Sequence, residues 1–208
     1  MENYKKNLDL LTKNHVYSKE MEHDACGVGL IASTEGKKSR AIVEYGIEAL
    51  KAVWHRGAVD ADGKTGDGAG IHVEIPNDVF IEKIKVTGHD YDNSEICVGM
   101  IFLPRNDYSA QENCKTIVES ELTKNNFSIY GWRQVPVNPK ILGEKALQTM
   151  PEITQVLFKS NDPNLLDKNL ERKIYEIRKR IENKAFDASL NNFYICSISS
   201  KAIIYKGL

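Results

Sequence analysis

The sequence contains no apolar run that approaches the roughly 20 residues needed to cross a bilayer, so we expect no membrane partner. Residues 1–25 lack the apolar stretch of a secretory signal and hold too much Asp and Glu for an organellar transit peptide. Neither sign of charge dominates, because 28 Lys and Arg stand against 29 Asp and Glu. Basic residues gather only at 170–184, interleaved with acidic ones, which is typical of a solvated helix face; nucleic-acid binding is the alternative there. We therefore predict a cytoplasmic protein with no nucleic-acid partner.

Cysteine is scarce and scattered. The four cysteines form no CxxC pair, and no His lies at the spacing of a zinc site: Cys26, Cys97, Cys114 and Cys196. We expect no metal site and no iron–sulfur cluster in this chain. Cytoplasmic thiols are reduced, and a cysteine taken alone is more often a small buried hydrophobe than a reactive group.

The length of 208 residues suits one domain with a substantial core. That domain is taken as residues 26–208, after a leader at 1–25 without a core-forming pattern. Apolar periodicity predicts strands at 26–33, 71–75, 96–103, 127–137, 153–158, 193–199 and 202–205, the last two forming a hairpin closed by Ser200-Lys201. It predicts helices at 40–54, 77–84, 114–122, 141–150 and 170–181. Adjacent closing strands favour an α+β fold, with helices packed over mainly antiparallel sheets, over a strictly alternating parallel fold.

Cys26 is the thiol whose neighbours favour chemistry. A thiol with a pKa of roughly 8.5 is only partly ionised at neutral pH, so a cysteine nucleophile needs a base. A cysteine at the chain terminus carries its own base, because a free α-amine has a pKa of about 8. If residues 1–25 are removed, Cys26 gains that amine, and Gly27 and Gly29 keep the backbone beside it free of side-chain bulk. The alternative is an ordinary core cysteine at the beginning of a strand.

The glycine- and aspartate-rich segment 55–70 is the second candidate for chemistry. Arg56 follows a predicted amphipathic helix, where a guanidinium can hold a carboxylate through two hydrogen bonds. Three acidic residues are candidate partners for the α-ammonium of an amino acid: Asp60, Asp62 and Asp67. The segment lacks the GxxxxGKS or GxxxxGKT pattern of a phosphate-binding loop. The alternative is a solvent-exposed turn with a surface arginine.

Particular stretches of this sequence resemble the glutamine amidotransferase domain at the start of glutamate synthases. The resemblance covers nearly all of the chain after residue 20. Four stretches carry it: DACGVGLIA at 24–32, HRGAVDADGKTGDGAGI at 55–71, GWRQVPV at 131–137 and YICSISSKAIIYKGL at 194–208. The first two are the most specific, because their combination at this spacing is hard to meet by chance.

The resemblance implies an N-terminal-nucleophile hydrolase fold, in which two β-sheets are stacked between helical layers. It also implies that the leader is removed and that Cys26 attacks the side-chain amide of L-glutamine. A glutamyl thioester forms, ammonia leaves, and water releases glutamate. Arg56 is expected to bind the α-carboxylate of glutamine, while His55, Asp67 and Gly27 are expected near the substrate.

For the complete enzyme, the resemblance implies that ammonia is delivered to 2-oxoglutarate for reductive synthesis of a second glutamate. No cofactor is expected in residues 1–208. FMN and an iron–sulfur cluster are expected in downstream synthase domains of the same chain. A small NADPH-oxidising subunit is a further expected partner.

The sequence departs from the family pattern in one important respect. The Asn-Gly pair that stabilises the oxyanion is absent from residues 1–208, and such a donor contributes roughly 10²–10³ in rate. We therefore interpret residues 26–208 as the front part of the domain, incomplete at its C-terminus, with little activity alone. Two alternatives stay open. One is another N-terminal-nucleophile amide hydrolase, against which Arg56 argues, and the other is an inactive fragment or precursor that serves only as a structural module.

Removal of the leader is predicted at the Ala25–Cys26 bond. While that bond is intact, the nitrogen of Cys26 is an amide and cannot accept the thiol proton, so the precursor should be inactive. N-terminal sequencing and intact-mass spectrometry of the protein from cells should find a mature chain that starts at Cys26. An active protein that still begins at Met1 would contradict this mechanism.

Overall fold

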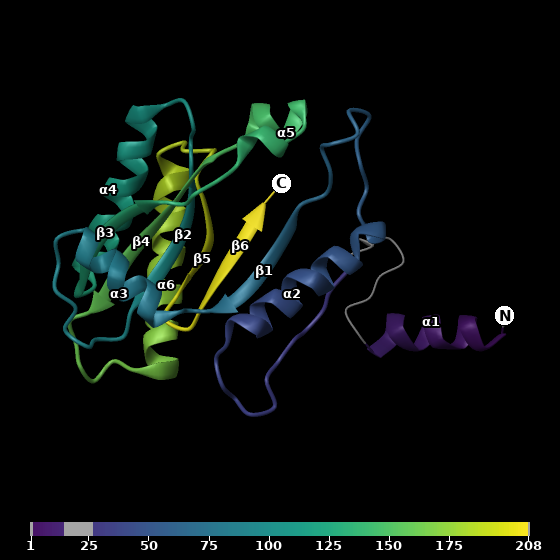
Figure 1. The fold of residues 1–208 in the computed structure, drawn as a ribbon, viewed down its shortest axis with the longest axis horizontal. Helices are drawn as coiled ribbons and strands as arrows, with labels where there is room; N and C mark the ends of the chain where they lie inside the picture. The colour runs from purple at the N-terminus through teal and green to yellow at the C-terminus, as the bar shows by residue number, and fades with distance from the viewer. Residues whose placement is uncertain (1, 15–26, 208) are drawn as a thin grey trace.

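The structure is a computed structural model that describes residues 2–14 and 27–207. Its strands are β1 (Ala69–Glu74), β2 (Cys97–Leu103), β3 (Phe127–Gln134), β4 (Glu152–Ser160), β5 (Tyr194–Ser199) and β6 (Ala202–Gly207). Its helices are α1 (Glu2–Asn14), α2 (Arg40–Ala52), α3 (Asn77–Val86), α4 (Tyr108–Lys124), α5 (Glu144–Thr149) and α6 (Asp167–Asp187). Short 3₁₀ turns are η1 (Trp54–Arg56) and η2 (Pro139–Ile141). Figure 1 shows the strands gathered in the centre with helices around them.

The larger sheet is antiparallel throughout, with the strand order β3-β4-β2-β5. Nearly every residue of β2 is buried, as expected for a continuous apolar run covered on both faces. Helices α4 and α6 pack on one face of this sheet and build the first core with it. The apolar stripe predicted for α6 is buried in this core: Leu170, Ile174, Ile177 and Ile181.

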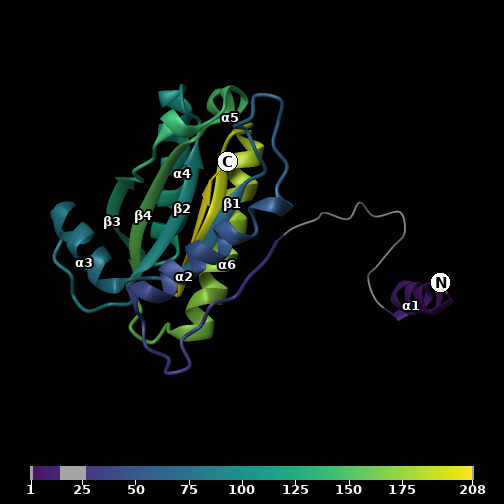
Figure 2. The same cartoon turned by 45° about the vertical axis from the view of Figure 1, so that its right-hand side comes forward.

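A two-stranded antiparallel sheet of β1 and β6 lies against the other face of the larger sheet. The second core fills the space between the sheets with side chains from both, including Val98, Met100, Leu157 and Ile203. Helix α2 lies beside β1 (Figures 1 and 2), where a Cβ at Gly46 would be 3.3 Å from Cδ1 of Ile71. Two antiparallel sheets with helices on the outside confirm the predicted α+β sandwich.

The hairpin predicted for 193–199 and 202–205 is wrong. β5 pairs with β2 in the larger sheet, whereas β6 pairs with β1 in the smaller one. A two-residue hairpin turn needs residues that readily adopt positive φ, typically Asn or Gly, and Ser200-Lys201 offers neither. Instead, the Ser199 hydroxyl accepts hydrogen bonds from the amides of Lys201 (2.9 Å) and Ala202 (3.3 Å), and this corner carries the chain from one sheet to the other.

The strand predicted at 26–33 is also wrong where the structure describes it. Residues 27–33 have no regular secondary structure, and Val28 and Leu30 are 90% and 88% exposed. A strand needs a neighbour to satisfy its N–H and C=O groups, and no strand of the described residues pairs with this segment. Cys26 itself lies outside the described residues.

Within the segment predicted to be a leader, residues 2–14 form α1. Leu10 in this helix is about half exposed, and both views show α1 apart from the sheets (Figures 1 and 2). No described residue of α1 belongs to either core. Among the helices of 2–14 and 27–207, none is long and apolar enough to span a membrane.

The first core should be sensitive to truncation of the α6 stripe. Ile177 is fully buried, so Ile177→Ala should lower the free energy of unfolding by about 2–5 kcal/mol through lost burial and a residual cavity. Tyr175 on the same helix is 59% exposed, and Tyr175→Ala should change it by less than about 1 kcal/mol. Urea unfolding followed by circular dichroism measures both. Equal losses in the two variants would contradict the assignment of the buried face.

Candidate active site

The segment predicted to bind substrate begins where α2 ends. Beyond α2 the chain tightens into η1 (Trp54–Arg56), which is closed by a hydrogen bond from the Gly57 amide to the Trp54 carbonyl (3.0 Å). His55 and Arg56 therefore lie at the entrance to the glycine-rich loop, as the sequence predicts. The His55 side chain is exposed; for Arg56 the structure describes the backbone.

Residues 57–68 fold back on themselves as a narrow ladder. Val59 and Gly66 form an isolated antiparallel bridge, and the Asp60 amide donates to the Thr65 carbonyl at 2.7 Å. At the tip, Gly63 has a φ of +66°, which glycine adopts without strain. The loop is thus an ordered projection next to η1.

Asp62 fixes this loop to the beginning of α5. Its Oδ1 accepts hydrogen bonds from the amides of Lys64 (2.9 Å) and Thr65 (2.7 Å), and its Oδ2 accepts from the Thr65 hydroxyl (2.6 Å) and the Glu144 amide (3.1 Å). These hydrogen bonds lower the pKa of Asp62 to about 2. The largest contribution comes from the Thr65 hydroxyl, followed by the amides of Thr65 and Lys64. The approach is so close that a Cβ at Gly143 would be 2.1 Å from the Thr65 hydroxyl oxygen.

The other two aspartates of the loop have different partners. Asp60 accepts hydrogen bonds from the Lys145 ammonium and the Ala61 amide, both at 2.6 Å, and these contacts lower the pKa of Asp60. Asp67 accepts a hydrogen bond from the Ala58 amide at its Oδ2 (2.9 Å), while its Oδ1 has no donor among the described residues. Asp60 and Asp62 therefore hold the loop in place, whereas the described hydrogen bond of the Asp67 carboxylate lies within the loop itself.

A hollow of about 460 Å³ lies where the loop continues into β1. It is lined by Gly68, Ala69, Gly70, Ile71, His72, Ile204 and Lys206. Gly68 and Gly70 permit the close approach of β6, because a Cβ at either position would be 3.0 Å from a carbonyl oxygen of that strand. The hollow is shallow and open to solvent.

The segment that follows Cys26 begins at the same end of α2 as η1. In both views the start of residues 27–33 lies beside η1, and the segment then runs along α2 (Figures 1 and 2). Gly27 is exposed. The structure thus brings the beginning of this segment and the His55–Arg56 turn into one region of the molecule.

The three other cysteines are buried, which affects the reactivity of their thiols. Cys97 in β2, Cys114 in α4 and Cys196 in β5 are unpaired and buried. Desolvation raises the pKa of all three, that of Cys114 to about 11. A thiol with so high a pKa is protonated at neutral pH and is a poor nucleophile, which leaves Cys26 as the candidate.

Sequence reasoning missed the contacts between the loop and α5. The Asp-Gly-Lys-Thr stretch at 62–65 is a signal for a local turn closed by the aspartate side chain. However, Glu144 and Lys145 are 82 and 85 residues from the aspartates that they contact. No periodicity or motif in a single sequence links positions so far apart.

Comparison with known protein families agrees with this arrangement. The sequence matches the family described as glutamine amidotransferases class-II over residues 26–208. The match begins at Cys26 and includes η1, the glycine-rich loop and both sheets. The chain belongs to the class-II glutamine amidotransferases.

Among individual proteins, the chain is similar to glutamate synthases. It is 53% identical over 205 residues to the glutamate synthase (NADPH) large chain of Azospirillum brasilense, and 38% identical over 189 residues to the chloroplastic ferredoxin-dependent glutamate synthase of Spinacia oleracea. The ferredoxin-dependent glutamate synthase 2 of Synechocystis is 37% identical over 188 residues. These alignments cover 99%, 90% and 90% of this chain but only 14%, 12% and 12% of the relatives.

The attachment of the loop by Asp62 predicts a specific titration. A lowered pKa means that the hydrogen bonds to Asp62 stabilise the fold above the ordinary value of 3.8 and are lost as the pH falls through about 2. Carbon-detected NMR of the Asp62 carboxyl should give a midpoint near that lower value. Thr65→Val removes the strongest hydrogen bond and should move the midpoint upward. A midpoint near 3.8 in the unmodified protein, or one that Thr65→Val leaves in place, would contradict this role.

Proposed function

We propose that this chain is the glutaminase part of a glutamate synthase, with Cys26 as its nucleophile. The observation that carries the proposal is the family match that begins at Cys26. It is supported by the burial of Cys97, Cys114 and Cys196, which removes the other thiols from consideration. The similarity to glutamate synthases from bacteria and plants points to the enzyme in which this part works.

In the proposed reaction, removal of residues 1–25 exposes the α-amine of Cys26. The amine accepts the thiol proton, and the thiolate attacks the side-chain carbonyl carbon of L-glutamine. The C–N bond breaks and the nitrogen leaves as ammonia with the transferred proton, which produces a glutamyl thioester. Water then attacks the thioester, releases glutamate and returns the proton to sulfur.

The substrate is proposed to lie between the beginning of residues 27–33 and the loop. Arg56 binds the α-carboxylate of glutamine, a task suited to the planar guanidinium. Asp67 binds the α-ammonium through Oδ1, which has no donor among the described residues. His55 and Gly27 line the same space. Asp60 and Asp62 are assigned no contact with substrate, because α5 engages both.

In the complete protein, the released ammonia is proposed to combine with 2-oxoglutarate in downstream domains of the same chain. FMN and an iron–sulfur cluster are assigned to those domains. The described residues of this chain hold no group of three or more His, Cys, Asp or Glu able to bind a metal. A cytoplasmic location and a small NADPH-oxidising subunit complete the proposal.

Replacement of Cys26 tests this function directly. In the full-length gene product, Cys26→Ala should reduce release of glutamate from glutamine by at least about 10³-fold, because no other ionisable thiol can take its place. Cys114→Ala is the matched control, since Cys114 is buried in α4 and should leave the rate within about twofold. Equal glutamate release by Cys26→Ala and the unmodified protein would remove Cys26 from this role.

Labelling distinguishes a glutaminase from another amide hydrolase or an inactive module. Diazo-oxo-norleucine, a glutamine analogue that alkylates thiols, should label Cys26 in the native protein and spare the three buried cysteines. Peptide mass spectrometry locates the label, and excess L-glutamine should protect against it. Labelling that asparagine suppresses as well as glutamine does would favour a different amide substrate.

A further inference from the structure

A second, smaller hollow lies at the far end of β1 from the candidate active site. Its volume is about 150 Å³, and charged side chains dominate its lining: Lys38, Glu74, Glu95 and Lys201. They come from the turn before α2, the end of β1, the segment before β2 and the corner between β5 and β6. The hollow beside Gly68 extends along β1 as far as His72, and this one begins at Glu74, so the two share a strand but no lining residue.

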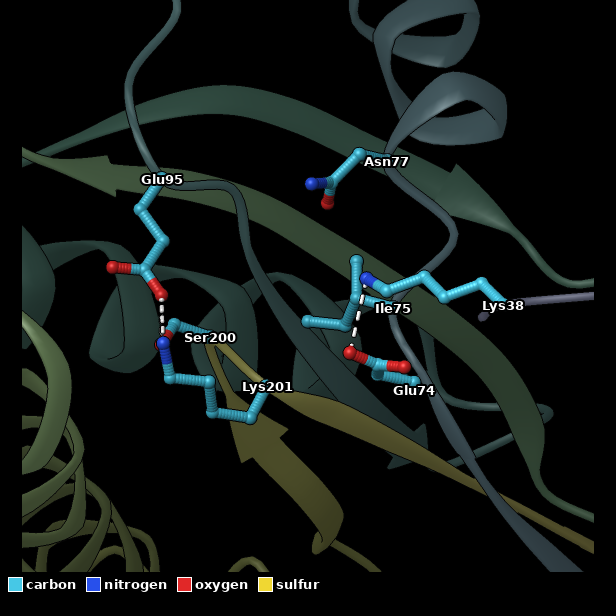
Figure 3. A pocket seen from close by; sticks show the side chains of 7 residues that line it. All are labelled: Lys38, Glu74, Ile75, Asn77, Glu95, Ser200 and Lys201. Atoms are coloured by element: carbon cyan, nitrogen blue, oxygen red, sulfur yellow. Dashed lines mark hydrogen bonds and ion pairs between the residues drawn. The ribbon is translucent and has the colours of Figure 1, made fainter. Parts of the chain in front are cut away.

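Two ion pairs face this hollow from opposite sides. Figure 3 shows Lys201 with Glu95 on one side and Lys38 with Glu74 on the other, and Ile75 between them. The N–O distances are 2.6 Å for Lys201–Glu95 and 3.0 Å for Lys38–Glu74. The lining therefore presents both signs of charge to an incoming molecule, and Asp167 at the beginning of α6 also pairs with Lys201 (3.2 Å).

These four groups retain the capacity to bind more partners. An ammonium group has three donors and a carboxylate has about four acceptor positions. Ion pairs as exposed as these contribute little to stability, so they can adjust to a ligand. The hydroxyl of Ser200 donates to Glu95 (2.9 Å), which leaves its oxygen as an acceptor facing the same space. Hydrogen bonds to the carboxylates raise the pKa of Lys201, chiefly the bond to Glu95 and then the one to Asp167, so the ammonium stays protonated.

We propose that this hollow binds a small α-amino acid in its zwitterionic form, at a site separate from the candidate active site. The carboxylate of the ligand contacts Lys38 and Lys201, and its ammonium contacts Glu74 and Glu95. The apolar Ile75 lies between the pairs, where it contacts the aliphatic part of the ligand. A simple anion would meet two carboxylates and a simple cation two ammonium groups, so a ligand with both charges is selected.

L-Alanine is a suitable probe because it has both charges and no side-chain amide for Cys26 to cleave. The full chain, labelled with nitrogen-15, is titrated with L-alanine and with two matched compounds: N-acetyl-alanine, which has no ammonium, and alanine amide, which has no carboxylate. L-Alanine should produce saturable shifts of the amides of Glu74 and Lys201. The two matched compounds should bind at least about tenfold more weakly, because each loses charge-assisted hydrogen bonds.

Two neighbouring lysines provide a matched pair of variants. Lys38→Met should weaken L-alanine binding at least about tenfold. Lys37→Met should leave it unchanged, because Lys37 pairs with Glu35 and does not line the hollow. Non-saturable shifts, equal shifts from all three compounds, or equal affinity in Lys38→Met and Lys37→Met would overturn the proposal. None of these results depends on glutaminase activity, so this site and the function of Cys26 are tested separately.

Discussion

The burial of β2 on both of its faces is the constraint on which the rest of the structure depends. Its side chains alternate between two cores: Cys97, Ile101 and Leu103 contribute to one, Val98 and Met100 to the other. At the centre of the strand, a Cβ on Gly99 would be 2.7 Å from Cγ1 of Val156, so β2 and β4 pack closely. One core is closed by α4 and α6 and the other by a second sheet. The chain must therefore leave the larger sheet after β5, and the corner at Ser199 brings β6 to β1. The glycine-rich loop lies at the beginning of β1.

The parts of the fold that the sequence predicted well are those that a local pattern encodes. The continuous apolar run at 96–103 became β2, and the helical spacing from Leu170 to Ile181 became the buried face of α6. The errors concern pairing. Residues 27–33 are as apolar as a buried strand, but apolarity does not supply a neighbour to bond with. Likewise, β5 and β6 are strands as predicted, but β5 pairs with β2 and β6 with β1. Ser200-Lys201 is unsuited to a two-residue hairpin turn, and Ile203 of β6 packs in the second core.

In the candidate site, too, local features were predictable from the sequence and long-range contacts were not. The motif at 55–71 located the loop, and His55 and Arg56 belong to η1, the short turn that precedes it. Contacts with α5 also separate the three aspartates of the loop. Asp62 and Asp60 attach the loop to Glu144 and Lys145, whereas one oxygen of Asp67 has no donor among the residues that the structure describes. The cysteines are distinguished by their burial, which no local sequence pattern encodes. Burial raises the pKa of Cys97, Cys114 and Cys196, so these three thiols are protonated at neutral pH.

We propose that the freed α-amine of Cys26 is the base that activates its thiol. The pH dependence of alkylation of Cys26 by iodoacetamide tests it most directly, with the processed protein compared with a form whose leader is retained by Ala25→Pro. We expect Cys26 of the processed protein to react with an inflection clearly below the ordinary thiol pKa of about 8.5. In the form with the leader, the inflection should lie at or above that value. The same inflection in both forms would rule out the α-amine as the base.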